Sequence, residues 1–296
     1  MNNNKIHIKD INNNSFINSF DSYKKNLEES NNTDILYIDN LLNLSSEAKI
    51  KVHDTITIGA ETGYGKTALA VNIANSCLNA YNVVYVNVDS NNIDIQQRLI
   101  SQATKCNIDD ITIDKAYDYY NTFLLNKKKL MFLNDTNLDN IIKFIKAINE
   151  QSNVTIVVII DTINNIDTSK NSSYENLKEV SKKLRDLTRN SNIIMFNLAQ
   201  LNRASKKSEK SIIDCDMHSF TDASDIENDS TQVLLFGEKN GKDYITVKKN
   251  RYNSSCINNN IEVNYKRENQ VIIEVQESTA AAETPKKAPK PQKKKK

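Results

Sequence analysis

Runs of apolar residues divide the chain into strands and helices that follow one another in turn. Ile56 and Ile58 alternate with polar neighbours, as in a strand, and the Ala- and Val-rich run after Thr67 has helical spacing. Further strands are predicted at 83–88, 130–133, 154–160 and 193–198, and helices from about 92, over 108–126, over 137–150 and over 173–190. Strands that alternate with helices predict an α/β fold with a mainly parallel central sheet.

The pattern changes after residue 230, where short apolar runs follow one another with no helical run between them. Strands are expected at 233–236, 244–248, near 260–265 and near 270–275. Asn240-Gly241 lies between the first two and is typical of a tight hairpin turn. The sheet is therefore expected to end in antiparallel strands.

The first fifty residues are predicted to form an arm outside the main domain. Phe16, Phe20, Tyr23 and Leu27 recur at spacings of four and three, which predicts a short amphipathic helix that ends near Asn31. A single helix of this kind cannot bury its apolar stripe alone, so it packs on its own domain or on a neighbouring subunit; we favour the second. We expect an arm at 1–50, with a lead-in from residue 33, one large domain at 51–276 and a tail at 277–296.

The amino-acid composition sets the last twenty residues apart from the rest of the chain. The 296 residues are 39% hydrophobic, enough for one sizeable core, and the net charge is +2. Residues 277–296 contain seven lysines and two glutamates, which is +5, so the rest of the chain is mildly acidic at −3. All three prolines also lie in this tail, which we expect to be disordered and either to bind nucleic acid weakly or to act as a solubilising segment.

The cysteines and the hydropathy pattern exclude several classes of protein. Cys77, Cys106, Cys215 and Cys256 are scattered along the chain without C-x-x-C spacing, which argues against a zinc site and against a disulfide framework. No window approaches the length of an apolar membrane span, and the N-terminus lacks the apolar run of a signal peptide. We expect a soluble protein of the reducing cytoplasm with no membrane partner.

A glycine-containing loop between the first strand and its helix has the pattern of a phosphate-binding loop (P-loop, Walker A). Gly63 and Gly65 allow backbone N–H groups to turn inward, Lys66 is expected to reach the β- and γ-phosphates of ATP, and Thr67 to ligate Mg²⁺. The first motif position holds Ala60 in place of glycine. The expected nucleotide-binding residues of this phosphate loop are Ala60, Glu61, Thr62, Gly63, Tyr64, Gly65, Lys66, Thr67 and Ala68.

Polar residues at the ends of three other strands supply the remaining candidate chemistry. Asp161 closes a strand rich in β-branched residues and is a candidate Walker B acid that holds Mg²⁺, partly through water. Asp89 follows the second strand, and Gln200 follows 193–198 as a candidate sensor of the γ-phosphate. An aspartate that ends a buried strand is ordinarily a loop starter, but the phosphate loop favours the metal role for Asp161.

A basic stretch without apolar periodicity follows the strand at 193–198. Its cations are predicted to lie on a mobile loop that contacts nucleic acid, and the alternative is a solvated surface turn. These cations are Arg203, Lys206, Lys207 and Lys210.

Several motifs in the same order resemble the RecA-like C-terminal domain of DnaB-family replicative helicases over about residues 50–265. Besides the phosphate loop, 83–100 is similar to the family's strand, catalytic acid and Gln-Arg-Leu helix, and 198–203 to its Leu-Ser-Gln-Leu-Asn-Arg signature. Residues 226–229 resemble its Ile-Glu-Gln-Asp, and Lys249-Asn250-Arg251 its Lys-x-Arg pair.

The resemblance implies a RecA-like P-loop NTPase that works as an ATP-dependent helicase. It implies a homo-oligomer, a hexameric ring, with ATP at each subunit interface, Mg²⁺ as cofactor and single-stranded DNA in the pore during replication. It further implies that Lys249 and Arg251 reach across the interface as a sensor lysine and an arginine finger, and that Asp89 replaces the glutamate that polarises the attacking water.

The chain departs from the family pattern at three places. Asp89 is one methylene shorter than the family's glutamate, so efficient hydrolysis depends on a closer approach or on an additional water. The family's DNA-contacting Arg-Glu-Ser-Gly loop falls on 221–224, which lacks its arginine and its glycine; Thr221 and Ser224 are candidate DNA contacts there. Phosphate contacts would then come from backbone N–H groups or from the basic loop at 206–210. We expect the family's primase-recruiting N-terminal domain to be missing, so that a loader or primase acts in trans.

Three classes of function remain open at this point. The leading hypothesis is a replicative helicase with ATP hydrolase activity. Its rival is a RecA-like ATP-binding assembly or scaffold protein with weak or no hydrolysis, and Asp89 is the feature that separates the two. A RecA-type recombinase is the third class, but the sequence shows no signal for it.

Overall fold

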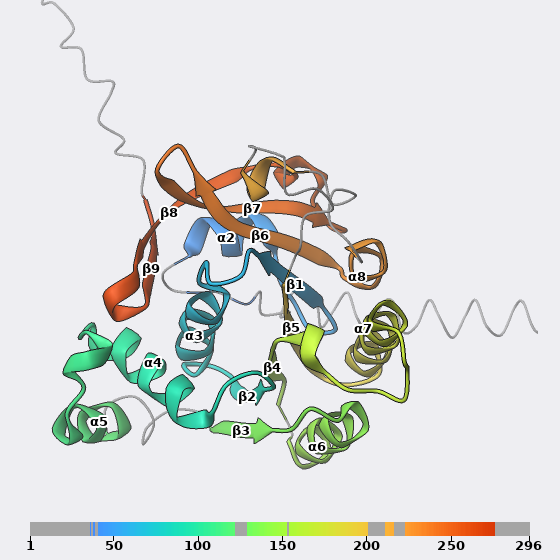
Figure 1. Ribbon diagram of the computed structural model, residues 1–296, viewed down its shortest axis with the longest axis horizontal. Coiled ribbons are helices and arrows are strands. Elements are labelled where there is room, and N and C mark those ends of the chain that lie inside the picture. Colours follow the sequence, from blue (N-terminus) through green and yellow to red (C-terminus); the bar gives the residue numbers. More distant parts are fainter. Residues whose placement is uncertain are drawn as a thin grey trace, which may run out of the picture.

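One mixed sheet organises the protein. The computed structural model describes residues 36, 38, 41–121, 129–152, 154–200, 211–215 and 223–275. In this part of the chain the strands lie in the order β3-β2-β4-β5-β1-β6-β7-β8-β9, with β3 at one end of the sheet and β9 at the other (Figure 1). The strands are β1 (Thr55–Ala60), β2 (Asn82–Asn87), β3 (Leu130–Asn134), β4 (Ile156–Asp161), β5 (Ile193–Gln200), β6 (Gln232–Lys239), β7 (Lys242–Asn250), β8 (Asn260–Lys266) and β9 (Val271–Glu274).

The strand directions confirm the predicted fold class. Strands β1 to β6 pair in parallel, and β6 to β9 pair antiparallel. The parallel strands β1 and β4 are buried along their whole length, as expected for strands that helices cover on both faces. Because parallel strands all end at the same edge, Ala60, Asp161, Gln200 and Asn87 come together there.

Helices cover both faces of the sheet. The described α-helices are α2 (Leu42–Ala48), α3 (Lys66–Cys77), α4 (Asn92–Thr104), α5 (Ile113–Tyr119), α6 (Leu138–Gln151), α7 (Ser173–Arg189) and α8 (Ala223–Asp229). Short 3₁₀ turns are η1 (Ile108–Asp110), η3 (Ile163–Asn165), η4 (Ile212–Asp214), η6 (Ser254–Cys256) and η7 (Arg267–Asn269). None of the described helices is long and apolar enough to span a membrane.

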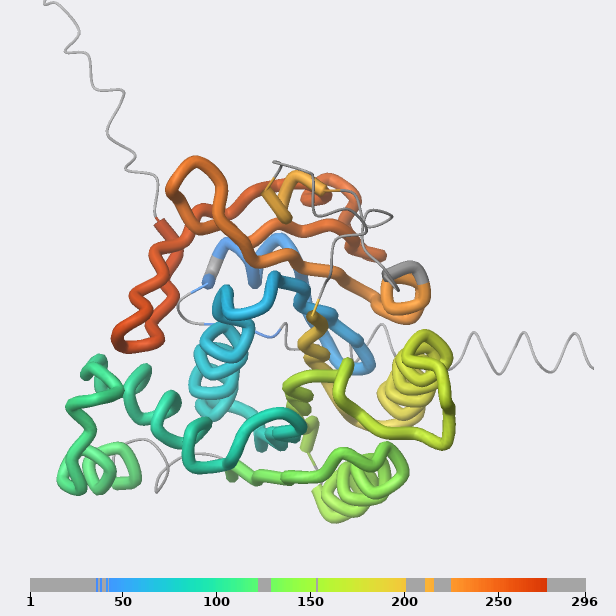
Figure 2. Tube along the Cα trace, in the orientation of Figure 1, coloured from blue at the N-terminus to red at the C-terminus, as the bar shows by residue number. Residues whose placement is uncertain are grey.

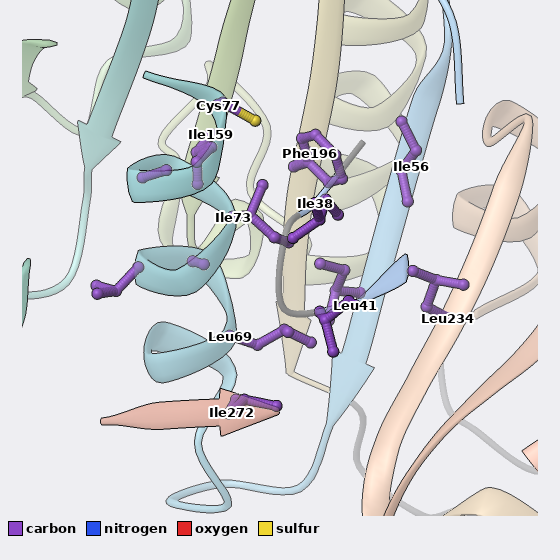
Figure 3. Packing of buried hydrophobic residues seen from close by; sticks show 14 of the residues in the cluster. Ile38, Leu41, Ile56, Leu69, Ile73, Cys77, Ile159, Phe196, Leu234 and Ile272 are labelled. Carbon is purple, nitrogen blue, oxygen red and sulfur yellow. The ribbon is translucent and has the colours of Figure 1, made fainter. Parts of the chain in front are cut away.

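The core consists of two apolar clusters, one on each face of the sheet. Helices α2, α3 and α4 pack on one face, where Leu69 and Ile73 of α3 meet Ile159 of β4 and Phe196 of β5 (Figure 3). Helices α6 and α7 pack on the other face, against the side chains of β4 that alternate with Ile159. The alternation along β4 therefore fixes its register, because a shift by one residue would exchange the two faces.

The C-terminal strands return to the helix that follows the phosphate loop. In the trace, the hairpin of β8 and β9 lies beside α3 (Figure 2). Contacts at the end of this hairpin include Asn72 of α3, whose side chain donates to the carbonyl oxygen of Gln270 and accepts from the N–H of Ile272. The antiparallel strands are thus packed against the same helix that begins at Lys66.

The structure differs from the predicted elements in several local respects. The helix expected over 108–126 is divided, in its described part, into η1 and α5, with Ile111 and Thr112 extended between them. Val154 was expected inside a buried strand, but β4 begins at Ile156 and Val154 is exposed. Helices α2 and α8 lie where no helix was expected. Strand β7 continues to Asn250, so Lys249 belongs to a strand and not to a loop after it. The predicted helix at 16–27 and the tail at 277–296 lie outside the described residues.

Candidate active site

The phosphate loop joins β1 to α3 at the edge where the parallel strands end. Gly63 and Gly65 have φ of 75° and 125°, values in the region where residues with a Cβ are strained. Gly65 is also the residue immediately before α3, so the loop leads directly into a helix N-terminus. The N-terminal N–H groups of a helix lack intrahelical partners, and their partial positive charge attracts phosphate.

Lys66 is folded over the phosphate loop. Its Nζ donates to the carbonyl oxygens of Ala60 and Glu61, both at 3.2 Å. The residue is only 8% exposed, and this burial lowers the pKa of Lys66, while the carboxylates of Asp161 and Asp89 act in the opposite direction. The ammonium group therefore lies between two carbonyls and two acids, where an anionic phosphate would be a stronger partner than either carbonyl.

Thr67 and Asp161 meet as the sequence predicted. The Thr67 hydroxyl donates to Oδ2 of Asp161 at 2.8 Å, and the hydroxyl of Tyr85 donates to the same oxygen at 3.0 Å. Asp161 is 4% exposed, and its burial raises the pKa of the carboxyl group despite both hydrogen bonds and the nearby Lys66. Tyr85, on β2, was not predicted, because in the sequence it reads as one more apolar residue of a buried strand.

These oxygens fit a magnesium ion that keeps part of its water shell. Among the described residues, no group of three or more His, Cys, Asp and Glu side chains could enclose a metal ion. Mg²⁺ in nucleotide sites is held by one or two protein oxygens together with waters and phosphates, which is what a hydroxyl and a desolvated carboxylate at one point provide. Thr67 and Asp161 are therefore the residues that would hold it.

Gln200 is the last residue of β5, and its side chain reaches the phosphate loop. Its Nε2 donates to the hydroxyl of Thr62. The side chain of Asn164, on η3, fixes the main chain of Gln200 from both sides: it accepts from Gln200 N at 2.7 Å and donates to Gln200 O at 3.3 Å. Asn164 therefore holds the end of β5 in place beside the phosphate loop.

Asp89 lies at the solvent-exposed side of the same edge. The turn that carries it is closed by buried Asn87, whose side chain accepts from Ser90 N and donates to Ser90 O. Asn165 Nδ2 donates to Oδ1 of Asp89 at 2.8 Å. Asn164 and Asn165 thus orient Gln200 and Asp89 respectively, and their place shortly after the strand end at Asp161 is the sequence signal that could have identified them.

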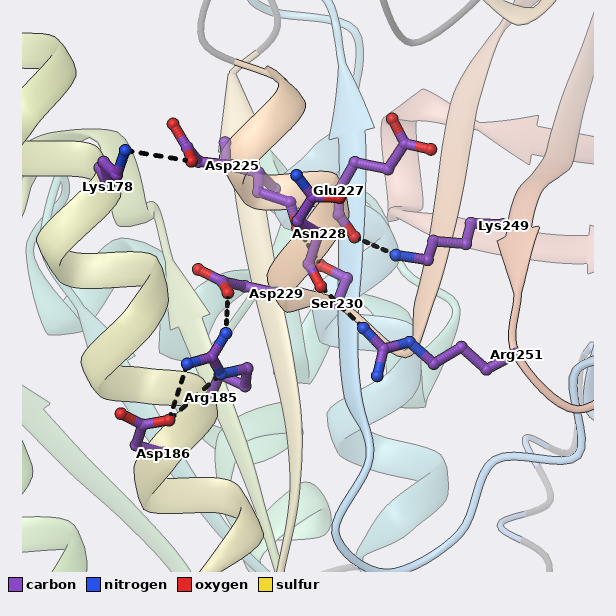
Figure 4. A network of polar contacts seen from close by, with 11 residues as sticks. Lys178, Arg185, Asp186, Asp225, Glu227, Asn228, Asp229, Ser230, Lys249 and Arg251 are labelled. Atoms are coloured by element: carbon purple, nitrogen blue, oxygen red, sulfur yellow. Dashed lines mark hydrogen bonds and ion pairs between the residues drawn. The ribbon is translucent and has the colours of Figure 1, made fainter.

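Lys249 and Arg251 do not lie beside the phosphate loop but at the C-terminal end of α8. Both cations reach the C-terminal carbonyl groups of α8 (Figure 4): Lys249 Nζ donates to Glu227 O, and Arg251 Nη2 donates to Asn228 O at 2.7 Å. The last carbonyls of a helix lack intrahelical donors and carry partial negative charge, so they attract cations. Burial, and then the neighbouring Arg251, lower the pKa of Lys249.

The helix that binds these cations is held in place by ion pairs with α7. Arg185 of α7 forms an ion pair with Asp229, and Lys178 of α7 lies 3.6 Å from Asp225; Asp186, also in α7, lies 2.9 Å from Arg185 and orients its guanidinium (Figure 4). The exposed pairs contribute little by themselves, whereas the Asp229 carboxylate is largely buried. Helix α8 is thereby fixed relative to the sheet, and with it the two cations.

The register of the sheet separates this pair from the phosphate loop. Strand β7 ends opposite the beginning of β6, which in turn lies beside Ile56 at the beginning of β1. The N–H of Arg251 donates to the carbonyl oxygen of Thr231, whose own N–H donates to Thr55. The phosphate loop begins at the other end of β1, about 17 Å away at 3.3 Å per residue. Lys249 and Arg251 therefore lie at the opposite edge from the loop of their own chain.

The side chains of the predicted DNA-binding residues lie outside the part of the chain that the structure describes. Arg203, Lys206, Lys207, Lys210 and Thr221 lie outside the described residues, and so does the side chain of Ser224, the second residue of α8.

Comparison with known proteins identifies the family. The sequence model of the DnaB-like helicase C-terminal domain matches residues 50–276, which is most of the chain. The chain belongs to the DnaB-like helicase family. No curated protein matches it in sequence.

Solved structures share the fold of this DnaB-like domain at low sequence identity. A DnaB-like replicative helicase, described together with its interactions with primase, matches with a TM-score of 0.73 at 14% identity, over 88% of this chain and 66% of that protein. A second solved structure, an ATPase domain, matches with a TM-score of 0.72 at 14% identity, over 89% of this chain and 98% of that domain. A KaiC-like protein from the archaeon Pyrococcus horikoshii OT3 matches with a TM-score of 0.58 at 15% identity, over 82% of this chain and 100% of that protein. The chain spans just under two-thirds of the replicative helicase.

Family and fold together confirm the resemblance seen in the sequence. The matched model is that of a helicase domain, and the similar structures include a DnaB-like replicative helicase and an ATPase domain.

The buried carboxylate of Asp161 leads to a prediction about stability. Asp161→Asn removes a desolvated charge but keeps an oxygen that can accept from Thr67 and Tyr85, so we expect the nucleotide-free protein to be more stable by about 1 kcal/mol. For a domain of this size this corresponds to a rise in Tm of about 2–4 °C. Thermal unfolding of both proteins without Mg²⁺ measures it, and added Mg-ADP should stabilise the wild type more than the variant. A lower Tm for Asp161→Asn would contradict this account.

Proposed function

We propose that the protein is an ATP-dependent helicase motor that assembles as a homohexameric ring and moves along single-stranded DNA during replication. The observation that best supports this is the division of the candidate catalytic residues between two edges of the sheet. Lys66, Thr67 and Asp161 lie at one edge, and Lys249 and Arg251 at the other. Such a division is useful only where copies of the chain meet, since the second edge of one copy can complete the site of the next.

At each interface the residues of this chain would have distinct tasks. The phosphate loop would bind the phosphates through its N–H groups, and Lys66 would exchange its two carbonyl partners for phosphate oxygens. When Mg²⁺ is bound it neutralises phosphate charge, and Thr67 and Asp161 would hold it, the latter partly through water. Gln200 would lie beside the terminal phosphate, because its side chain already contacts Thr62.

Asp89 is the residue that would activate the attacking water. Its carboxylate is exposed at this edge, and Asn165 fixes one of its oxygens, which leaves the other for a water molecule. The developing charge on the transferred phosphoryl group would be stabilised by Lys249 and Arg251 of the neighbouring subunit. To reach it, both cations must leave the α8 carbonyls.

DNA binding is proposed to come from the basic stretch after β5 and from residues around the start of α8. The candidates are Arg203, Lys206, Lys207 and Lys210 in the first group and Thr221 and Ser224 in the second. A partner such as a loader or primase would act in trans.

A second function is favoured by one specific observation, the short side chain at Asp89. An aspartate at the position of the family's glutamate leaves the attacking water less well placed, and a displacement of about 1 Å can cost about a hundredfold in rate. The alternative is therefore a RecA-like ATP-binding scaffold that uses nucleotide to order an oligomer and hydrolyses ATP slowly or not at all.

Stimulation of ATP turnover by DNA separates the two functions. With Mg²⁺ and ATP, the purified full chain is expected to hydrolyse ATP at least several-fold faster when single-stranded DNA is added, since translocation couples turnover to DNA contact. Steady-state phosphate release with single-stranded DNA, duplex DNA and no DNA measures this. Negligible, DNA-independent turnover from a well-formed ring would exclude the motor and support the scaffold.

The conservative variant Asp89→Glu locates the cause of a slow rate. The longer side chain restores the reach that the family uses, so a rate increase would show that the water-activating acid limits turnover. Asp135→Glu, on a partly exposed acid just after β3 that accepts from Asn137 and from Asn140 of α6, is the matched control and should leave the rate unchanged.

A further inference from the structure

The side chain of Tyr64 leaves the phosphate loop and binds the C-terminal strands. Its hydroxyl donates to Oδ1 of Asp243 at the start of β7, and its ring meets Phe236 of β6 edge-on, with centroids 4.9 Å apart and the planes at 76°. Burial and the carboxylate of Asp243 raise the pKa of Tyr64. The tyrosine is therefore a neutral donor that links the loop to two antiparallel strands.

Arg267, on η7, reinforces this link from the other side. Its guanidinium lies 5.2 Å from the centroid of Tyr64 and 4.7 Å from that of Tyr265, and its Nη1 donates to the carbonyl oxygen of Tyr64 at 3.3 Å. Its Nη2 lies 3.9 Å from the Asp243 carboxylate. A Cβ at Gly65 would come within 2.6 Å of Tyr265. Both the side chain and the main chain of the loop are thus in contact with the C-terminal strands.

Binding of a phosphate group must disturb this part of the loop. The carbonyl oxygen of Glu61 accepts from Lys66 Nζ and also from the N–H of Tyr64 at 3.2 Å. When Lys66 turns to a phosphate, one of the two donors that hold the turn at 61–64 is lost. Tyr64 is the residue at the end of that turn, so its hydroxyl transmits a rearrangement of the loop to Asp243.

Strand β7 connects Asp243 to the other edge of the sheet. Asp243 is its second residue and Lys249 its eighth, and six residues of strand span about 20 Å. Strand β6 pairs with β7 along its length, and β8 pairs with its first half. Beyond β7 the chain is anchored by Tyr252, whose hydroxyl donates to buried Asp54 at 2.7 Å. A displacement at Asp243 therefore passes along a paired strand to Lys249 and Arg251.

We propose that Tyr64 and Asp243 are positioning residues that couple the nucleotide occupancy of one subunit's phosphate loop to the placement of Lys249 and Arg251 in the neighbouring subunit's site. This coupling rests on the proposed arrangement of the site between subunits. Its consequence is that sites in one oligomer bind ATP cooperatively, and that the cooperativity depends on one hydrogen bond inside each subunit.

Equilibrium binding of Mg-ATPγS to the full-length oligomer tests the coupling without requiring hydrolysis. The wild type is expected to bind with a Hill coefficient above 1. Asp243→Ala should lower the Hill coefficient to about 1 and change the midpoint by no more than about threefold, because Asp243 lies outside the phosphate loop. Glu262→Ala, which removes another ion-paired carboxylate of the C-terminal strands, is the control and should bind as the wild type does.

Tyr64→Phe keeps the ring and removes only the hydroxyl, so it should reproduce the effect of Asp243→Ala. If the two residues act through one bond, the double variant is no more impaired than either single variant. Tyr119→Phe, which removes the hydrogen-bonded hydroxyl of a tyrosine on α5, is its control. Independent sites in the wild type, an unchanged Hill coefficient in Asp243→Ala, or additive effects in the double variant would each overturn the proposal. If ATP binding is cooperative but single-stranded DNA does not stimulate turnover, the proposed motor function is wrong and the proposed coupling still holds.

Discussion

Arg251→Ala is expected to lower ATP turnover about 10³-fold or more while leaving nucleotide binding nearly unchanged. The guanidinium lies at the edge opposite its own phosphate loop, so it contributes nothing to binding by that loop. The role proposed for it is the stabilisation of charge in the transition state of the neighbouring site, and arginine fingers contribute about 10³ to 10⁵ in rate.

Single-turnover phosphate release and binding of fluorescent ADP, measured on the same oligomer, distinguish these two effects. Arg267→Ala provides a comparison, because that arginine contacts the phosphate loop of its own chain and should change nucleotide affinity as well as rate. A large loss of ADP affinity in Arg251→Ala, or a rate within tenfold of the wild type, would contradict the assignment of Arg251 to the neighbouring site.

Lys66→Ala is expected to abolish turnover and also to weaken binding of Mg-ATP. The lysine is the buried cation of the phosphate loop, and its removal leaves the acids Asp161 and Asp89 without their nearest positive charge. Loss of a preorganised group of this kind costs about 10² to 10³ in rate even where substrate still binds. Nucleotide binding by equilibrium titration, followed by steady-state turnover, measures both losses.

Mixing the two inactive variants gives the stronger test. In a mixed oligomer, a subunit with Arg251→Ala still has an intact phosphate loop, and a neighbour with Lys66→Ala still has an intact Arg251. Roughly a quarter of the interfaces in a random equal mixture would then be complete, so activity should return although each variant is inactive alone. The double variant Lys66→Ala, Arg251→Ala mixed with either single variant is the control and should stay inactive. No recovery after subunit exchange would show that the two residues do not share a site between copies.

The sequence predicted the strands and the phosphate loop because their signals are local. The β-branched run of β4 and the loop between β1 and α3 can be recognised from neighbouring residues alone, and the common edge of a parallel sheet then brings Thr67 and Asp161 together. The same reasoning placed Gln200 at a strand end, and its contact with Thr62 agrees with that placement.

The features that the sequence did not reveal depend on distant contacts. Helix α2 has only seven residues, and two N–H groups of its first turn, from Asn43 and Leu44, donate to the carboxylate of Glu274 in β9 at 2.8 Å. The bond from Tyr64 to Asp243 likewise joins residues that are far apart in the chain. No local propensity encodes such pairs, because they exist only once the C-terminal strands have folded back onto the phosphate loop.

The position of the two edges also determines how many sites an assembly can contain. An interface that joins the phosphate-loop edge of one copy to the Arg251 edge of the next is heterologous, with different surfaces on its two sides. A pair of subunits joined in this way has one complete site and one unused surface of each kind. Only a closed ring has as many complete sites as subunits, and opening such a ring at one interface would inactivate one site and leave the others intact.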